Sequence, residues 1–223
     1  MRADIIFSFL KELAANNNRE WFKQHQAQYE AVNREVEQLM TILVARISFF
    51  EPEVMHLEAK DCMYRIYRDL RFTQDKTPYK THIGGFVNAK GKKSLHCGYY
   101  VHLEPGHCMV AGGGWCPRPD MLKGIRQSIC DNLEEFQEIV TAPSFTKHFS
   151  TIGMEKLKTA PKGFPKDFPC MDYLRPKDYV IWKDVPDSFF SEPDFIDRTL
   201  EIFQAMKPYH DFLNYTIDQY PEN

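Results

Sequence analysis

The sequence predicts an α+β fold in which an antiparallel sheet of four or more strands packs against a long helix of the N-terminal half and a C-terminal helix. Two observations predict it. Apolar residues recur at helical spacing near both ends of the chain, and short strand-like segments separated by turns fill the middle. A length of 223 residues with 43% hydrophobic content suits one domain with its own core. We therefore expect a single α+β domain over residues 1–223.

Residues 1–50 are predicted to be helical. Asp4 suits the N-cap of a short first helix, and the asparagines at 16–18 end it. Asn17, followed three positions later by Glu20, matches a capping box. The apolar spacing that follows predicts one second helix of about 30 residues that ends before Pro52.

The sheet is expected at about 62–116. Its four strand-like segments are CMYRIY (62–67), IGGFVNA (83–89), LHCGYYVHL (95–103) and HCMVAGGGW (107–115). Pro105 and Gly106 suit the central positions of a type II turn between the last two. Strand alternation then places Tyr99 on one face of the sheet, and Tyr100 and His102 on the other.

The second half of the chain returns to helices. We expect helices at about 119–140, an irregular proline-rich segment at 141–187 with an edge strand at 178–182, and a C-terminal helix at about 193–215.

Composition indicates a cytoplasmic protein without a membrane partner. The apolar run near the N-terminus is too short and too close to charged residues for a signal peptide or a membrane span. The six cysteines form no C-x-x-C pair and no compact disulfide framework, so we expect reduced thiols. The sequence does not indicate an oligomeric state.

The charge distribution points to one segment. The net charge is −3, yet residues 60–93 carry nine Lys and Arg against three Asp, so the remainder of the chain is acidic. A local positive field on an acidic body favours a small anionic ligand over a long polyanion. The expected binding residues, all within 65–80, are Arg65, Arg68, Asp69, Arg71, Asp75, Lys76, Tyr79 and Lys80.

These residue types suit an anion. Arginine binds planar oxyanions with two parallel hydrogen bonds, while lysine and tyrosine add charge and a further donor. Asp69 and Asp75 would orient the cations, or serve as acid or base if the protein is an enzyme. Two alternatives stay open: an interaction module that docks an acidic protein or, less favoured, nucleic acid, and a purely structural network of internal ion pairs.

No cofactor or metal is predicted. The glycines 112–114 match neither a dinucleotide fingerprint nor a P-loop, and close packing explains them equally well. On one predicted strand, His96 and His102 would lie about 20 Å apart, too far to share an ion. Without a zincin motif or a nucleophile elbow, the sequence assigns no catalytic residue.

The charged segment also resembles a family signature. The pattern R-x-x-R-D-x-R-F-x-x-[DN]-K-x-x-Y, which begins at Arg65 and ends at Tyr79, resembles that of the family called domain of unknown function 2461. NNNREWF (16–22), the GGGW-x-P turn (112–117) and PKGFP (161–165) before DYLRPKDY (172–179) are similar to its other patterns. The resemblance implies a bacterial, cytoplasmic, single-domain protein of no assigned activity, in which the signature residues matter together.

Overall fold

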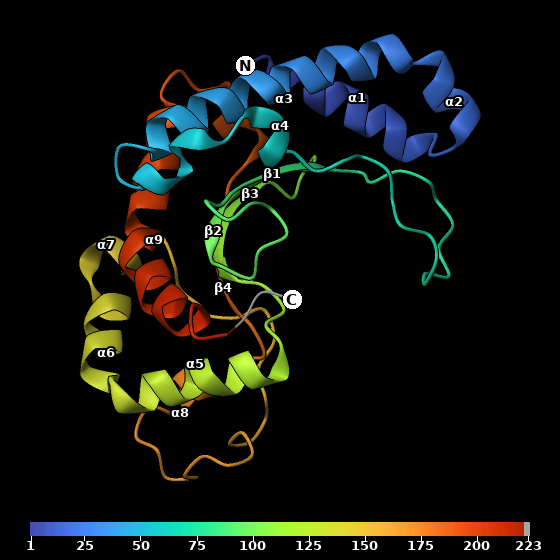
Figure 1. Cartoon of the computed structure of the whole chain (residues 1–223). Helices are drawn as coiled ribbons and strands as arrows, with labels where there is room; N and C mark the ends of the chain where they lie inside the picture. The colour runs from blue at the N-terminus through green and yellow to red at the C-terminus, as the bar shows by residue number, and fades with distance from the viewer. Residues whose placement is uncertain (221–223) are drawn as a thin grey trace. The chain divides into compact units, whose positions relative to one another are not determined.

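Helices form the N-terminal part of the chain. The computed structural model describes residues 1–220, and α1 (Ala3–Ala15), α2 (Arg19–Gln24) and α3 (Gln26–Ile47) come first. In Figure 1 the blue helix α1 lies alongside α3. The apolar stripe of α1 is buried, and the ring of Phe9 lies 6.0 Å from that of Tyr29 on α3. The predicted helical stripes are therefore core faces.

Two details of this region correct the sequence prediction. The N-cap of α1 is Arg2, where the sequence predicted Asp4. The N-cap of α2 is Asn18, where the sequence predicted Asn17, and its side chain accepts a hydrogen bond from the Trp21 amide. The predicted second helix is interrupted at His25, where φ is −105° and ψ is 19°. The ring of His25 stacks on Trp21 at 4.0 Å, and its Nδ1 lies 2.8 Å from the Trp21 carbonyl oxygen, a local arrangement that ends α2.

The sheet is four-stranded and antiparallel, as predicted. Its strands are β1 (Ile83–Val87), β2 (Gly98–Leu103), β3 (Met109–Gly114) and β4 (Tyr179–Asp184), in the order β1-β2-β3-β4. The predicted turn is present: Gly106 has a φ of +80°, and the His107 amide donates to the Glu104 carbonyl at 2.9 Å. Glycine suits this positive φ because it has no Cβ.

The expected first strand, 62–67, is wrong. Cys62 ends the short helix α4 (Ala59–Cys62), which follows the 3-10 helix η1 (Pro52–His56). The chain then changes its pairing partner: the Tyr64 amide donates to Gly84, whereas the Ile66 carbonyl accepts from Lys80. The second partner segment contains Pro78, which has no amide hydrogen to extend a ladder. Only isolated bridges form as a result.

The remaining elements fill the second half of the described chain. They are α5 (Pro119–Asp131), α6 (Leu133–Thr141), α7 (Pro143–Thr146), α8 (Met171–Leu174), the 3-10 helix η2 (Asp187–Ser191) and α9 (Phe195–Ile217). The predicted helical stretch 119–140 is thus two helices with a break at Asn132, and the C-terminal helix lies close to its predicted range. Among residues 1–220, no helix has the length and apolar character needed to cross a membrane.

Internal contacts divide the chain into two compact units. The first comprises Met1–Lys92, Tyr100–Val110 and Asp184–Leu200, and the second Lys93–Tyr99, Ala111–Lys183 and Glu201–Asn223. The division passes through β2, β3, β4 and α9, so each unit holds part of the sheet. The single domain expected over residues 1–223 stays a prediction, and its residues 221–223 lie outside the described part of the chain.

Each unit packs a long helix against its part of the sheet. In the first unit, a Cβ added at Gly85 of β1 would lie 2.3 Å from the Met40 sulfur of α3. In the second, the ring of Tyr99 on β2 lies 5.1 Å from that of Phe203 on α9. The predicted packing of the two long helices on the sheet is confirmed.

Candidate functional site

The charged segment, residues 65–80, lies in a long hairpin-like loop between α4 and β1 (Figure 1). Tyr67 and Tyr79 form an antiparallel bridge at its base. The Asn17 side chain holds that base through two hydrogen bonds to the Tyr79 backbone, one to the carbonyl oxygen at 2.9 Å and one from the amide at 3.1 Å. Beyond the base lies an exposed tip, residues 68–77, called the charged loop below.

Two arginines of the charged loop are held by the loop's own carboxylates. Arg71 donates to both carboxylate oxygens of Asp69, at 2.7 to 3.2 Å. Arg68 pairs with Asp75 and also donates to the Thr77 hydroxyl. The bond from Arg71 lowers the pKa of Asp69 to about 2, and the Thr77 amide followed by Arg68 does the same for Asp75.

The remaining expected binding residues do not gather at one point either. Lys76 donates to the Leu70 carbonyl at 2.9 Å. Tyr79 is 5% exposed, and its ring stacks on Phe22 at 4.0 Å, so it packs against α2. The structure thus gives Arg68 and Arg71 separate local partners, and leaves Arg65 and Lys80 on a different surface.

That surface is one face of β1 and β2. A Cβ added at Gly84 would lie 2.4 Å from the Tyr100 hydroxyl oxygen, so the side-chain positions of these two residues point to the same side. Strand alternation adds Lys80, His82, His102 and Glu104. The Tyr64 ring lies 6.3 Å from that of Tyr100, and Arg65 is included because its charge acts on Lys80. We call this the polar face, formed by Tyr64, Arg65, Lys80, His82, Tyr100, His102 and Glu104.

Hydrogen bonds tie the middle of the polar face together. His102 Nδ1 lies 2.9 Å from the Tyr100 hydroxyl, and its Nε2 lies 3.1 Å from Glu104 Oε2. The Thr81 hydroxyl donates to the other Glu104 oxygen at 2.7 Å. The ring of His82 packs on that of His102, with centroids 4.5 Å apart. His102 is buried, while His82 and Glu104 are half-buried.

Burial and neighbouring charges shift several pKa values here. Burial, then His102, lowers the pKa of His82 to about 4, so its imidazole is neutral at pH 7. Burial would raise the pKa of Glu104, but hydrogen bonds from His102 and Thr81 outweigh it and lower the pKa. The pKa of Lys80 is lowered by burial and by the positive charge of Arg65.

Sequence reasoning missed the grouping of His82, His102 and Glu104. Their ligating atoms all lie within 4.8 Å of one another. Within residues 1–220, these three form a cluster of His and Glu side chains close enough to share a metal ion. His82 comes from the segment before β1 and therefore lies far from the other two in sequence. The one signal available was the spacing of His102 and Glu104, which places both on one face of a strand.

The glycine run is explained by packing in the second unit. The Gly113 amide donates to His210 Nε2 at 2.9 Å, and Gly113 has a φ of +93°. A Cβ at Gly112 would lie 2.6 Å from the same histidine nitrogen. Burial lowers the pKa of His210 to about 3, which keeps the nitrogen able to accept this bond.

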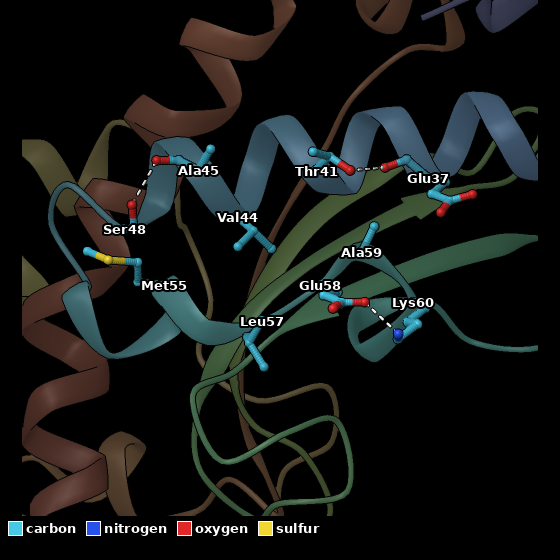
Figure 2. A pocket seen from close by; sticks show the side chains of 10 residues that line it. All are labelled: Glu37, Thr41, Val44, Ala45, Ser48, Met55, Leu57, Glu58, Ala59 and Lys60. Atoms are coloured by element: carbon cyan, nitrogen blue, oxygen red, sulfur yellow. Dashed lines mark hydrogen bonds and ion pairs between the residues drawn. The ribbon is translucent and has the colours of Figure 1, made fainter.

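A surface groove of about 530 Å³ lies along α3, between η1 and α4. Figure 2 shows that its polar side chains bond locally, with Thr41 donating to the Glu37 carbonyl and Lys60 paired with Glu58. Met55 and Val44 line the groove with apolar surface. Because its polar groups do not converge on one point, the groove is a weaker candidate for a binding site than the polar face.

Comparison with known families decides where the chain belongs. A family model described as "Conserved hypothetical protein (DUF2461)" matches residues 5–212, nearly the whole chain. The chain belongs to this family. The family that the sequence resembles is thereby confirmed. Membership of DUF2461 assigns no activity, and no curated protein and no solved structure matches the chain.

Proposed function

We propose that this DUF2461 protein binds a small phosphate-bearing anion on the polar face, at the end formed by Arg65 and Lys80. The observation that carries the proposal is the lack of a neutralising partner. Within residues 1–220, neither cation has a carboxylate at ion-pair distance, in contrast to the two arginines of the charged loop.

The two cations also act on each other. The charge of Arg65 lowers the pKa of Lys80, which means that the two positive charges repel. An anion between them would relieve this repulsion. Lys80 is half-buried and its ammonium lies 5.5 Å from the Tyr64 ring centroid, so part of its hydration is already lost before a ligand binds.

The rest of the charged segment would support this site rather than touch the ligand. The pairs Arg68–Asp75 and Arg71–Asp69, with Lys76 on the Leu70 carbonyl, would keep the charged loop folded. Tyr79 would fix its base against Phe22. In this proposal the structural ion network and the anion site occupy different parts of the signature.

A second candidate function rests on the exposed aromatic residues. Phe72 is 93% exposed at the tip of the charged loop, where its ring centroid lies 5.5 Å from the Arg71 guanidinium, and Tyr67 is 48% exposed. An acidic protein or a nucleic acid could dock there through stacking and charge. Binding of that kind would fall steeply with salt, whereas a compact site for one small anion would depend on salt weakly.

Thermal unfolding with inorganic phosphate, pyrophosphate and a nucleoside diphosphate, in the presence of EDTA, tests the proposal. We expect a saturable rise in the melting temperature of the wild type. Arg65→Gln should weaken the affinity for pyrophosphate by about 10-fold to 100-fold, the loss expected for one charged hydrogen bond.

Arg71→Gln is the matched control. It removes the same charge from the same segment, but from a guanidinium that Asp69 already holds. We expect wild-type affinity for pyrophosphate in this variant. Equal weakening by Arg65→Gln and Arg71→Gln, or no saturable stabilisation by any of the three anions, would contradict the proposal.

A further inference from the structure

The geometry of the polar face points to a second site. We propose that His82, His102 and Glu104 bind a divalent transition-metal ion such as Zn²⁺. This inference goes beyond anion binding and does not depend on it, because it rests on different side chains.

The three side chains are already close to a coordination geometry. Ligands about 2.1 Å from a tetrahedral ion lie roughly 3.4 Å from one another. His102 Nε2 and Glu104 Oε2 are 3.1 Å apart, and no ligating atom of the three residues is more than 4.8 Å from another. His82 is half-buried, and its ring packs on that of His102 with centroids 4.5 Å apart.

His102 and Glu104 each have a partner on the side away from the ion. The Tyr100 hydroxyl holds His102 Nδ1, and the Thr81 hydroxyl holds Glu104 Oε1. Metal-binding histidines and carboxylates are commonly fixed in this way, because the outer hydrogen bond sets the ring orientation and the tautomer. Because Gly84 has no side chain, the Tyr100 ring packs closely on β1, and this packing fixes the hydroxyl that holds His102.

Without an ion, the same atoms form a hydrogen-bonded chain. The Tyr100 hydroxyl then donates to Nδ1, and Nε2–H donates to Glu104. To bind an ion, His102 takes the other tautomer: Nδ1–H donates to the Tyr100 oxygen and the Nε2 lone pair faces the metal. The Nε2 proton passes to solvent while Nδ1 takes one up, so the tautomer change releases no net proton. Tyr100 keeps its own hydroxyl proton, and the ion lies where the Nε2 proton was.

The donor set indicates the type of ion. Two imidazole nitrogens and one carboxylate oxygen suit Zn²⁺ and Fe²⁺ better than Ca²⁺ or Mg²⁺, which prefer oxygen ligands. The Glu104 side chain is 27% exposed, so water can reach the ion. Three protein ligands with a position open to water are typical of catalytic rather than structural metal sites.

Isothermal titration of the EDTA-dialysed full chain with Zn²⁺ tests the inference. We expect one ion per chain, and a loss of affinity of at least about 100-fold in His82→Ala. Thr81→Val, which removes only an outer partner, should weaken binding about 10-fold. His107→Ala is the matched control, since it removes an exposed histidine from the turn after β2 and should leave the affinity unchanged.

A Co²⁺ titration followed by visible absorption identifies the ligands. The site proposed here gives ligand-field bands without a thiolate charge-transfer band. Binding that survives His82→Ala but is lost in Cys116→Ser, the exposed thiol, would overturn the proposal. So would the absence of stoichiometric binding, or equal losses in His82→Ala and His107→Ala.

Lys80→Met separates this site from the anion site. Lys80 lies two residues before His82 on the same face, so its positive charge opposes a dication there. Removing it should strengthen Zn²⁺ binding a few-fold while weakening the binding of pyrophosphate in EDTA. Weaker Zn²⁺ binding in Lys80→Met would count against the metal site alone, and unchanged pyrophosphate binding against the anion site alone.

Discussion

The charged loop and the polar face lie next to each other in the first unit, yet they differ in whether their cations are paired with carboxylates. In the loop, Asp69 and Asp75 pair with arginines only two and seven residues away, and the side chains remain exposed. On the polar face, Arg65 and Lys80 have no carboxylate partner among the described residues; Lys80 is half-buried and Arg65 is exposed. A dense run of charges therefore does not by itself mark a site. Charge that the protein's own carboxylates leave unneutralised does so better.

The largest effect expected on the polar face comes from Gly84→Ala. The added methyl would lie 2.4 Å from the Tyr100 hydroxyl oxygen and 2.7 Å from its ring, so the ring has to move and its bond to His102 is lost. We expect the free energy of unfolding to fall by roughly 2–3 kcal/mol. Urea denaturation measures the change.

Gly114→Ala serves as its control. The nearest atom to a methyl at that position would be the Tyr179 Cβ at 3.8 Å, which is ordinary contact. In a Tyr100→Leu background, Gly84→Ala should cost much less than in the wild type, because the clash is gone. If the two glycine variants were equally stable, the close packing of Tyr100 on β1 would be in doubt.

A smaller effect is expected where the loop joins the helices. Asn17→Ala removes both hydrogen bonds to the Tyr79 backbone and should lower the free energy of unfolding by about 1–2 kcal/mol. It should also speed proteolysis within residues 68–77, because the base of the loop is released.

The neighbouring Asn16 provides the comparison. Its side chain donates only to the exposed Glu12 carbonyl of its own helix, so Asn16→Ala should leave both readouts near wild type. A loop that is cleaved no faster in Asn17→Ala than in Asn16→Ala would show that something else anchors it.

The smallest effect is expected from the ion pairs of the charged loop. The pKa of Asp75 is lowered from 3.8 to about 2, so the native state binds this proton less tightly than the unfolded state. Its contribution to stability is complete above about pH 4 and is lost as the pH falls toward 2. Because the pair is exposed, Asp75→Asn should lower the melting temperature at pH 7 by no more than about 2 °C.

The pH dependence is the sharper measurement for this pair. Between pH 4 and pH 2, the melting temperature of Asp75→Asn should fall less steeply than that of the wild type. Asp167→Asn, at an exposed position without an ion pair among residues 1–220, should follow the wild-type curve. Parallel curves for all three proteins would mean that Asp75 contributes nothing to the folded loop.

Much of the fold was predictable because its signals are local. Apolar spacing predicted both long helices, and Pro105 with Gly106 predicted the turn between β2 and β3. The errors arose where another segment intervenes. At 62–67 the strand pattern is real, but the chain pairs first with β1 and then with 78–80, so no continuous strand forms. At His25 a ring stacked on Trp21 interrupts a pattern that is helical on both sides.

The binding site expected from the sequence stays a prediction. Of its eight residues, five lie in the charged loop, Arg65 and Lys80 on the polar face, and Tyr79 at the base of the loop. The sequence could not show that Asp69 and Asp75 pair with two of the arginines. It also gave no reason to join His82 to His102, since pairing of β1 with β2 is what brings them together.

The sequence by itself determined the α+β class, the family, and the segment in which positive charge is concentrated. Periodicity and composition are properties of neighbouring residues, so they can be read before folding. Only the tertiary structure decided which cations stay without a partner and which histidine meets which carboxylate. Those outcomes depend on burial and on strand register, which bring together side chains that the sequence keeps apart.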